Sequence, residues 1–239
     1  MAHKTETQLM ADLPPLPLAP CTPPFYHTAC DYFGPYTVKV GRNKTDKHYG
    51  VLFTCLNTRA VHLEMAVDCS TMEFLQVLRR FCAIRGQPSL MMTDNGTQFV
   101  GAEKELRQMV SGLNQLQIQE YCAEKGMHWK FTTPAAPHQN GCAEALVKTC
   151  KSALKKAIGS RLLTPFELYT VFLEVANLVN QRPIGRVPND PDDGGYISPN
   201  HMLLGRASPE VAQGPFKESR NPRHRVEFVQ KIVDSFWKR

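Results

Sequence analysis

The stretch Ser-Leu-Met-Met-Thr-Asp-Asn-Gly, residues 89–96, decides how the rest of the chain is interpreted. Its first five residues follow a proline and are mostly apolar, which is the pattern of a short buried strand. The strand is predicted to end at Asp94, because Asn95 and Gly96 tolerate the backbone angles of a sharp turn. Asp-Asn-Gly is also an ordinary turn sequence. The functional alternative is a carboxylate at the end of a strand, where open sheets usually keep their chemistry.

Upstream of this stretch, three strands joined by short turns are predicted over residues 25–40, 49–56 and 60–67. Such strands form an antiparallel meander. A helix then begins at a predicted capping box, Ser70 with Glu73, and returns the chain to the strand that ends at Asp94. A helical return is what parallel strands need. This order of elements is typical of a ribonuclease-H-like domain, an α/β fold with a mixed sheet of antiparallel and then parallel strands, flanked by helices.

The most informative helix follows a loop predicted over residues 134–141. One face is an apolar stripe made of Leu146, Val147, Cys150, Leu154, Ala157 and Ile158. Another face carries Glu144, Lys148, Lys151 and Lys155 at helical spacing. One interpretation is a solvated face stabilised by Glu–Lys pairs. The other is an acid that holds a metal ion beside bases that hold phosphates.

The composition limits the classes of protein to which the chain can belong. The sequence has no run of about 18 apolar residues and no apolar segment near its start, so we expect no membrane span and no secretory signal. Eight cysteines without a Cys-x-x-Cys pair do not indicate a disulfide scaffold, and we expect reduced thiols of an intracellular protein. The net charge is +6, and residues 217–239 hold seven Lys or Arg against three acids. This basic segment is either a solubilising tail or a phosphate-binding one.

Three acids stand in contexts that resemble the acidic triad of retroviral-type integrases. Asp31 lies in Ala-Cys-Asp-Tyr-Phe-Gly-Pro-Tyr, Asp94 in Thr-Asp-Asn-Gly-Thr-Gln-Phe, and Glu144 in Pro-His-Gln-Asn-Gly-Cys-Ala-Glu. The chain is most similar to integrases of BEL/Pao-type LTR retrotransposons. Further segments that resemble that family are Asn-Gln-Arg-Pro-Ile-Gly (180–185), Pro-Asn-Asp-Pro-Asp-Asp-Gly (188–194) and Met-Leu-Leu-Gly-Arg-Ala (202–207).

The chain departs from the family pattern in two ways. The segment between Asp94 and Glu144, residues 95–143, is longer than is usual in retroviral integrases. A predicted extra helical stretch at residues 113–125 accounts for the excess. The family's N-terminal His/Cys zinc module has no counterpart here, and the last residues resemble the opening of a further domain. The resemblance therefore implies a catalytic-core fragment without its zinc module and C-terminal domain.

The domain organisation that we expect follows from these matches. Residues 1–24 are rich in proline and predict a linker or arm. Residues 25–187 would form the ribonuclease-H-like integrase core, and residues 188–216 a C-terminal loop extension of it. Residues 217–239 would be a basic linker that leads to a truncated C-terminal domain.

The resemblance also implies the chemistry. Integrases join a DNA 3′-hydroxyl to a phosphodiester of another duplex with two Mg²⁺ (or Mn²⁺) ions per active site. Asp31 would bridge both ions, with Asp94 on one and Glu144 on the other, since Mg²⁺ prefers hard oxygen ligands. Lys148 and Lys151 match lysines that contact DNA, and Lys155 follows on the same face. Gln139 and Asn140 fall in the loop that approaches the reacting strand.

The implied partners are the element's DNA ends, the target duplex and further copies of the chain, with no membrane. The implied place of action is the nucleus, after synthesis in the cytoplasm. Two other functions stay open: a domesticated, non-catalytic DNA-binding or assembly protein, and a hydrolytic nuclease of the same fold. His138 in the loop is a candidate general base, the alternative being that a metal ion alone lowers the pKa of the attacking oxygen. His62 and Glu64 are assigned to the sheet.

Overall fold

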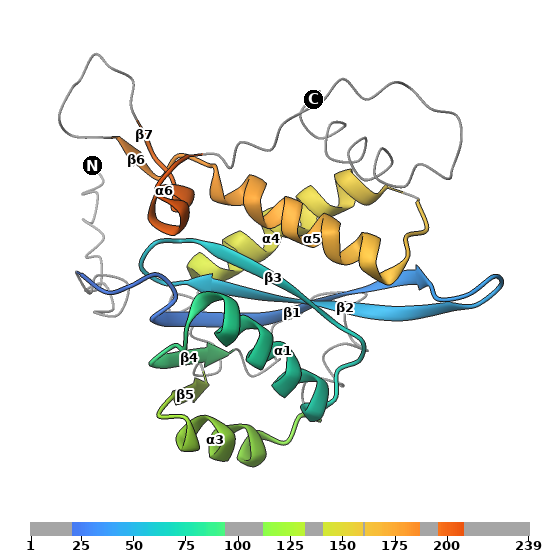
Figure 1. Ribbon diagram of the computed structural model, residues 1–239, viewed down its shortest axis with the longest axis horizontal. Helices are drawn as coiled ribbons and strands as arrows, with labels where there is room; N and C mark the ends of the chain where they lie inside the picture. Colours follow the sequence, from blue (N-terminus) through green and yellow to red (C-terminus); the bar gives the residue numbers. More distant parts are fainter. Residues whose placement is uncertain (1–20, 94–111, 132–140, 160, 187–195, 208–239) are drawn as a thin grey trace, which may run out of the picture.

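A mixed five-stranded sheet forms the centre of the protein (Figure 1). The computed structural model describes residues 21–93, 112–131, 141–159, 161–186 and 196–207. The strands are β1 (His27–Lys39), β2 (Thr45–Cys55), β3 (Val61–Ala66), β4 (Leu90–Thr93) and β5 (His128–Phe131), in the order β3-β2-β1-β4-β5. β1, β2 and β3 pair antiparallel, whereas β1–β4 and β4–β5 pair parallel. The predicted fold class is confirmed.

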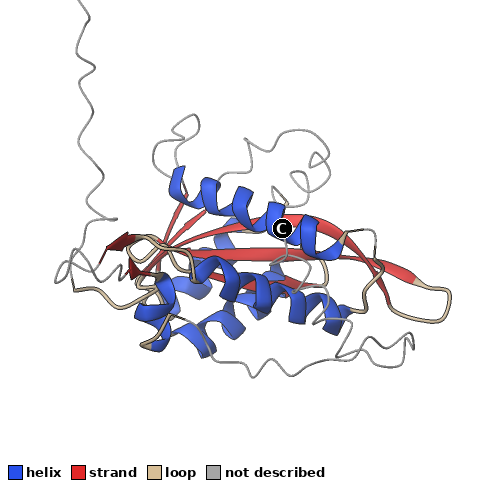
Figure 2. Ribbon diagram, turned by 90° about the horizontal axis from the view of Figure 1, so that it is seen from above, coloured by secondary structure: helices blue, strands red, loops and turns tan. Residues whose placement is uncertain are grey.

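Helices lie on both sides of this sheet, as Figure 2 shows. They are α1 (Thr71–Arg85), α3 (Gln115–Glu124), α4 (Gly141–Ile158), α5 (Pro165–Asn180) and the short α6 (Pro199–Leu204). The sequence pattern also predicts a helix over residues 99–110, which lie outside the described residues. Among the described helices, none combines the length and the apolar character that crossing a bilayer requires.

The segment expected to be a loop extension contains regular structure. β6 (Gly185–Arg186) pairs antiparallel with β7 (Tyr196–Ile197), and α6 follows directly. Strands of two residues leave no periodicity for a sequence pattern to reveal. α6 begins with Ser198 as its N-cap and a proline in its first turn, which together are a helix start signal present in the sequence.

The two faces of the sheet bury two different apolar cores because side chains alternate along each strand. On one side, Cys30 and Tyr32 of β1 pack with α1 and α3. On the other side, Phe33 of β1 packs with α4 and α5. The apolar stripe predicted for α4 is buried in this second core, apart from the half-buried Ile158. α4 is therefore fixed over one defined face of β1.

The starts of α1 and α5 differ in detail. At α5, Thr164 and Glu167 form the capping box that the sequence Thr-Pro-Phe-Glu (164–167) predicts, and the Glu167 carboxylate accepts from the Thr164 amide at 2.7 Å. At α1, only half of the box forms: the Glu73 amide donates to Ser70 Oγ at 3.2 Å. The Glu73 carboxylate instead accepts from the Val67 amide at 3.3 Å, and Asp68 caps the Ser70 amide at 2.8 Å. A nearby acid has taken the place of the capping glutamate.

β2 requires a glycine at residue 50, next to Phe33 of β1. It pairs with Phe33, and a Cβ atom at residue 50 would overlap the Phe33 ring. That ring is fully buried and contacts Phe172 of α5 at a centroid distance of 5.5 Å. The absence of a side chain at residue 50 thus lets an aromatic residue of β1 pack flat on the sheet beneath α5.

Gly50→Ala is expected to lower the free energy of unfolding by about 1–3 kcal/mol, because the Phe33 ring must leave its place in a packed core. Urea denaturation at neutral pH measures this. Gly41→Ala is the matched control: its Cβ would meet only Lys44 Cβ at 3.5 Å, an ordinary contact. Equal stabilities of the two variants would contradict this role of Gly50.

Candidate active site

Asp31 lies in the middle of β1, paired with Leu52 of β2. It alternates with Ala29 and Phe33 along the strand, and Phe33 belongs to the core beneath α4 and α5. The Asp31 side chain is therefore on the α4 side of the sheet. It is half-buried, so the carboxylate is held by the strand and still reaches solvent.

The parallel pairing of β1 with β4 determines the position of the strand that precedes Asp94, the second predicted acid. The paired residues run from His27 opposite Leu90 to Cys30 opposite Thr93. The residue that follows Cys30 is Asp31, and the residue that follows Thr93 is Asp94. Asp94 itself lies outside the described residues. The strand that precedes it is thus shown next to β1, in step with the strand that carries Asp31.

The third predicted acid belongs to α4. Glu144 lies in the first turn of this helix, and its side chain is outside the described part of the structure. Lys148 and Lys155 are exposed, and Lys151 is half-buried. The predicted loop residues Gln139 and Asn140, and with them His138, fall outside the described residues. The structure therefore brings the helix of Glu144 over the face of β1 that carries Asp31.

The described residues alone do not make a metal centre. Within them, no group of three His, Cys, Asp or Glu side chains is close enough to hold a metal ion. Asp94 and the side chain of Glu144, which belong to two of the three predicted ligands, lie outside what the structure describes. Asp31 does fit the role: the carboxylate of this half-buried residue offers the hard oxygen atoms that Mg²⁺ prefers.

The neighbouring thiol is unsuited to metal binding. Cys30 packs in the opposite core with α1, and its side chain is buried. Burial, together with the charges of Asp31 and Cys122, raises the pKa of Cys30 well above its usual value. The thiol next to Asp31 therefore stays protonated and lies on the other side of the sheet. At this point of β1 the Asp31 carboxylate, and not the thiol, is the group suited to bind a metal ion.

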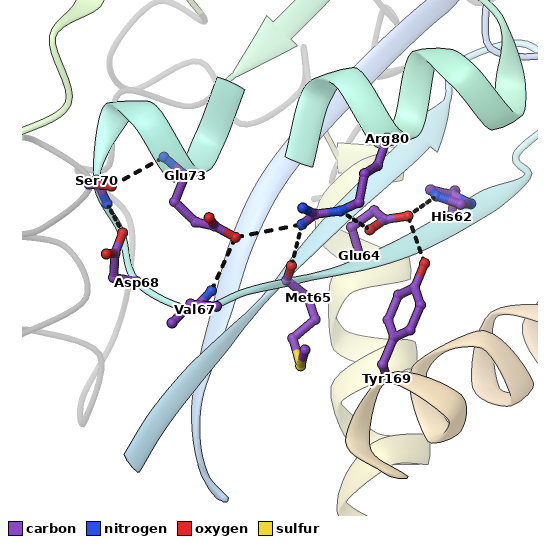
Figure 3. A network of polar contacts seen from close by, with 9 residues as sticks. All are labelled: His62, Glu64, Met65, Val67, Asp68, Ser70, Glu73, Arg80 and Tyr169. Atoms are coloured by element: carbon purple, nitrogen blue, oxygen red, sulfur yellow. Dashed lines mark hydrogen bonds and ion pairs between the residues drawn. The ribbon is translucent and has the colours of Figure 1, made fainter. Parts of the chain in front are cut away.

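A second charged cluster lies away from Asp31, at the sheet edge formed by β3 (Figure 3). The sequence pattern predicts that Glu64 lies in the sheet, and the structure shows in addition that this residue is completely buried. His62 Nε2 lies 3.0 Å from Glu64 Oε1, and the Tyr169 hydroxyl of α5 donates to the same oxygen at 3.2 Å. Arg80 of α1 donates through Nε to Glu64 Oε2 at 3.0 Å.

Each donor comes from a different element, so Glu64 joins both helical layers to the edge strand. Arg80 also donates to the Met65 carbonyl at 2.7 Å and lies 3.6 Å from Glu73. Because three protein donors already occupy its two oxygens, the Glu64 carboxylate has a structural role and is not a candidate metal ligand. These hydrogen bonds give a physical reason for the predicted place of His62 and Glu64 in the sheet.

The protonation states of this cluster follow from its contacts. Arg85 Nε donates to His62 Nδ1 at 3.2 Å, which assigns the His62 proton to Nε2, facing Glu64. Burial lowers the pKa of His62, and the Arg85 charge lowers it further, against the raising effect of Glu64. Burial alone raises the pKa of Glu64, but hydrogen bonds and charge from His62 and Arg80 bring it below its usual value. A neutral histidine beside an ionised glutamate is therefore the stable state.

The course of the chain is similar to that of three retroviral proteins. A chain of the simian T-cell lymphotropic virus intasome in complex with PP2A regulatory subunit B56 gamma matches with a TM-score of 0.50 and 14% identity, over 83% of this chain and 61% of that one. The BIV integrase catalytic core domain matches with a TM-score of 0.49 and 13% identity, over 76% of this chain and 95% of that one. The HTLV-2 integrase catalytic core domain in complex with magnesium gives 0.44 and 16%, over 70% and 93%.

At these identities the likeness concerns the fold alone, a mixed five-stranded sheet flanked by helices. The present chain spans 61% of the length of that intasome chain. No protein-family model matches the sequence, and no curated protein matches it either.

The Glu64 cluster should make the free energy of unfolding depend on pH. The folded pKa of His62 lies below its ordinary value of 6.5, so between these two pKa values the unfolded chain binds more protons than the folded one. Stability is therefore lost as the pH falls below about 6.5, by up to about 1.4 kcal/mol per pH unit. The lowered pKa of Glu64 adds a loss below its ordinary value of 4.5.

Urea denaturation between about pH 7.5 and pH 5.5 measures the first effect. His62→Gln is the matched variant, because a glutamine amide can still donate to Glu64 but does not titrate. The slope of stability against pH should be smaller in this variant than in the wild type. Parallel curves for the two proteins would show that His62 titrates alike in both states.

Proposed function

We propose that this chain is the catalytic core of a retroelement integrase, of the BEL/Pao type by sequence resemblance. It would join the 3′ ends of element DNA to target DNA by metal-dependent phosphoryl transfer. The observation that carries the proposal is the parallel register of β1 and β4, in which the residues just before Asp31 and Asp94 are paired. If the chain continues in this register beyond the last residue of β4, Asp94 would lie beside Asp31 of β1.

The position of α4 supports the third acid. α4 packs on the face of β1 to which Asp31 belongs, and Glu144 lies in its first turn. Three carboxylates drawn from two strands and a helix would suit an integrase, because phosphoryl transfer depends on positioning and charge neutralisation. A protein that only binds DNA gains nothing from three acids beside basic residues. This favours an enzyme over a non-catalytic binding protein.

Asp31, Asp94 and Glu144 would be the ligands of two Mg²⁺ or Mn²⁺ ions. Bound there, the ions would supply the charge that activates the attacking oxygen and stabilises the leaving one. The carboxylates hold and orient this centre, and no side chain needs to act as nucleophile, since the 3′-hydroxyl of DNA attacks. Lys148 and Lys151, with Lys155, would hold phosphates beside the acids, and Gln139 and Asn140 would approach the reacting strand.

The biological setting belongs to the same proposal. The partners would be the element ends, the target duplex and further copies of the chain, and the reaction would take place in the nucleus. The intasome that matches this fold supports an assembly of several chains on DNA, although the chain spans only part of that protein. The core would lie within residues 25–187, with a basic segment at residues 217–239.

Glu144→Gln separates catalysis from DNA binding. The amide keeps the size of the side chain but removes the charge that a metal ion needs, so strand transfer should be abolished. DNA affinity should stay equal or rise slightly, because one repulsive charge is removed. The measurement is strand transfer at saturating DNA, together with filter binding on the same protein. Joining of DNA ends by Glu144→Gln would contradict the assignment.

The matched variant on the same helix reverses charge instead of removing it. Lys148→Glu combined with Lys151→Glu should weaken DNA binding and reduce the slope of log K against log salt by about two units. It should leave metal binding by the acids intact. Both variants should remain folded, because none of the three residues belongs to the buried stripe of α4. Equal losses of DNA affinity in both variants would favour the solvated-helix interpretation.

A hydrolytic nuclease of the same fold would use the same acids, so the product distinguishes the two. A labelled donor end that becomes covalently joined to the target establishes strand transfer. Cleavage of DNA without joining would make the chain a nuclease.

A further inference from the structure

A groove beside α4 has a lining that the predicted DNA-binding face does not explain. It has a volume of about 680 Å³ and lies between α4, the end of α5 and β7. One wall is a row of Lys148, Ser152 and Lys156, which are four residues apart and so lie along one side of the helix. Consecutive helical residues are about 100° apart, so Lys156 faces away from the side of Lys155. Of the lysines on the predicted face, only Lys148 lines the groove.

The floor of the groove is apolar, and its far side carries an aromatic ring. Ala153, Leu178, Val179 and Pro183 provide the apolar surface. Tyr196 of β7 lines the groove and is 43% exposed, so its ring is accessible to a ligand. His201 supports this ring from α6, at a centroid distance of 6.1 Å and nearly perpendicular. The ring is therefore held in place by the β6–β7 hairpin and α6.

The charged residues that the structure describes in the lining of the groove are all positive. Lys148, Lys156 and Arg182 line it, and none of the described lining residues is acidic. Arg182 is fixed by the protein itself, because its guanidinium donates to the Val179 carbonyl at 2.7 Å and to the Arg59 carbonyl at 2.5 Å. Its positive charge is thus a permanent part of the wall, whereas the two lysines are exposed and can move to meet a ligand.

We propose that this groove binds an unpaired stretch of a DNA strand, with phosphates on Lys148 and Lys156 and a base against the apolar floor and the Tyr196 ring. Unpaired strands are bound by basic grooves that also offer aromatic rings, because their bases expose faces that can stack. A duplex presents phosphates and sugars on its outside and keeps its base faces stacked, so it would leave this floor and ring uncovered. The inference rests on the proposed function for the choice of DNA as the nucleic acid.

Fluorescence anisotropy tests this with the full chain in buffer that contains EDTA. The probes are a labelled oligothymidylate of about 12 nucleotides and a blunt mixed-sequence duplex of the same length. Tyr196→Ala should weaken binding of the oligothymidylate about fivefold or more, since loss of one stacked base has at least this effect. Duplex affinity should change by less than about twofold. Tyr196→Phe keeps the ring and should bind both probes like the wild type.

The lysine wall is tested by Lys156→Glu, which should reduce the slope of log K against log salt for the oligothymidylate by about 0.7 units. Arg79→Glu is the matched control, since it is exposed on α1, across the sheet from α4, and changes the charge equally. It should leave the slope unchanged. The proposal is overturned if Tyr196→Ala loses affinity equally for both probes, if it loses none, or if Lys156→Glu behaves like Arg79→Glu.

These measurements need neither metal ions nor catalysis. If the groove variants behave as expected but the wild type never joins DNA ends, the groove stands and the proposed function fails. If strand transfer occurs but the groove variants bind oligothymidylate normally, only the groove inference fails. Melting curves for Tyr196→Ala confirm that the hairpin change has not unfolded the chain.

Discussion

The parallel pairing of β1 with β4 is the constraint on which the candidate site depends. Its register sets Cys30 opposite Thr93, so the strand that leads to Asp94 runs in step with the strand that carries Asp31. A slip of one residue would turn every side chain of β4 to the other face of the sheet. The register is held by burial on both faces: Met91 packs in the core beneath α1, and Met92 contacts Ala29 on the opposite face.

The protein treats its acids in opposite ways. Glu64 is completely buried and accepts hydrogen bonds from side chains of β3, α1 and α5. Its ionised carboxylate, with the charge balanced by Arg80, is therefore a fixed part of the scaffold. Asp31 is half-buried in the strand next to a thiol that stays protonated. An acid that is to bind a ligand needs access to it, whereas a structural acid needs its own donors. The degree of burial therefore distinguishes the structural acid, Glu64, from the candidate metal ligand, Asp31, more clearly than their positions in the sequence do.

Much of the fold could be predicted because its signals are local. The short turns that join β1, β2 and β3, the Ser70 start of α1 and the apolar stripe of α4 each depend on residues that are close together in the sequence. The candidate acids could be identified because their sequence contexts resemble those of a family, although Asp94 and the Glu144 side chain lie outside the described residues.

What could not be predicted depends on distant residues. Tyr169 meets Glu64 across 105 positions of sequence, and no periodicity reports such a contact. β6 and β7 are too short to give a pattern, so the place of Tyr196 beside Lys156 and Arg182 was not visible either. The face of α4 was predicted as one row of Lys148, Lys151 and Lys155. Packing against α5 also places Lys148 and Lys156 along one groove, which a helical repeat without a partner helix cannot show.

Binding of Mn²⁺, followed by electron paramagnetic resonance of the free ion, tests the central claim most directly. If Asp31, Asp94 and Glu144 share one centre, then Asp31→Asn, Asp94→Asn and Glu144→Gln should each weaken Mn²⁺ binding strongly. Combining any two should then weaken it by less than the sum of the single effects, because ligands of one centre act as a unit. Mn²⁺ binding that is unchanged by all three substitutions, or that declines by independent additive steps, would contradict a shared metal centre.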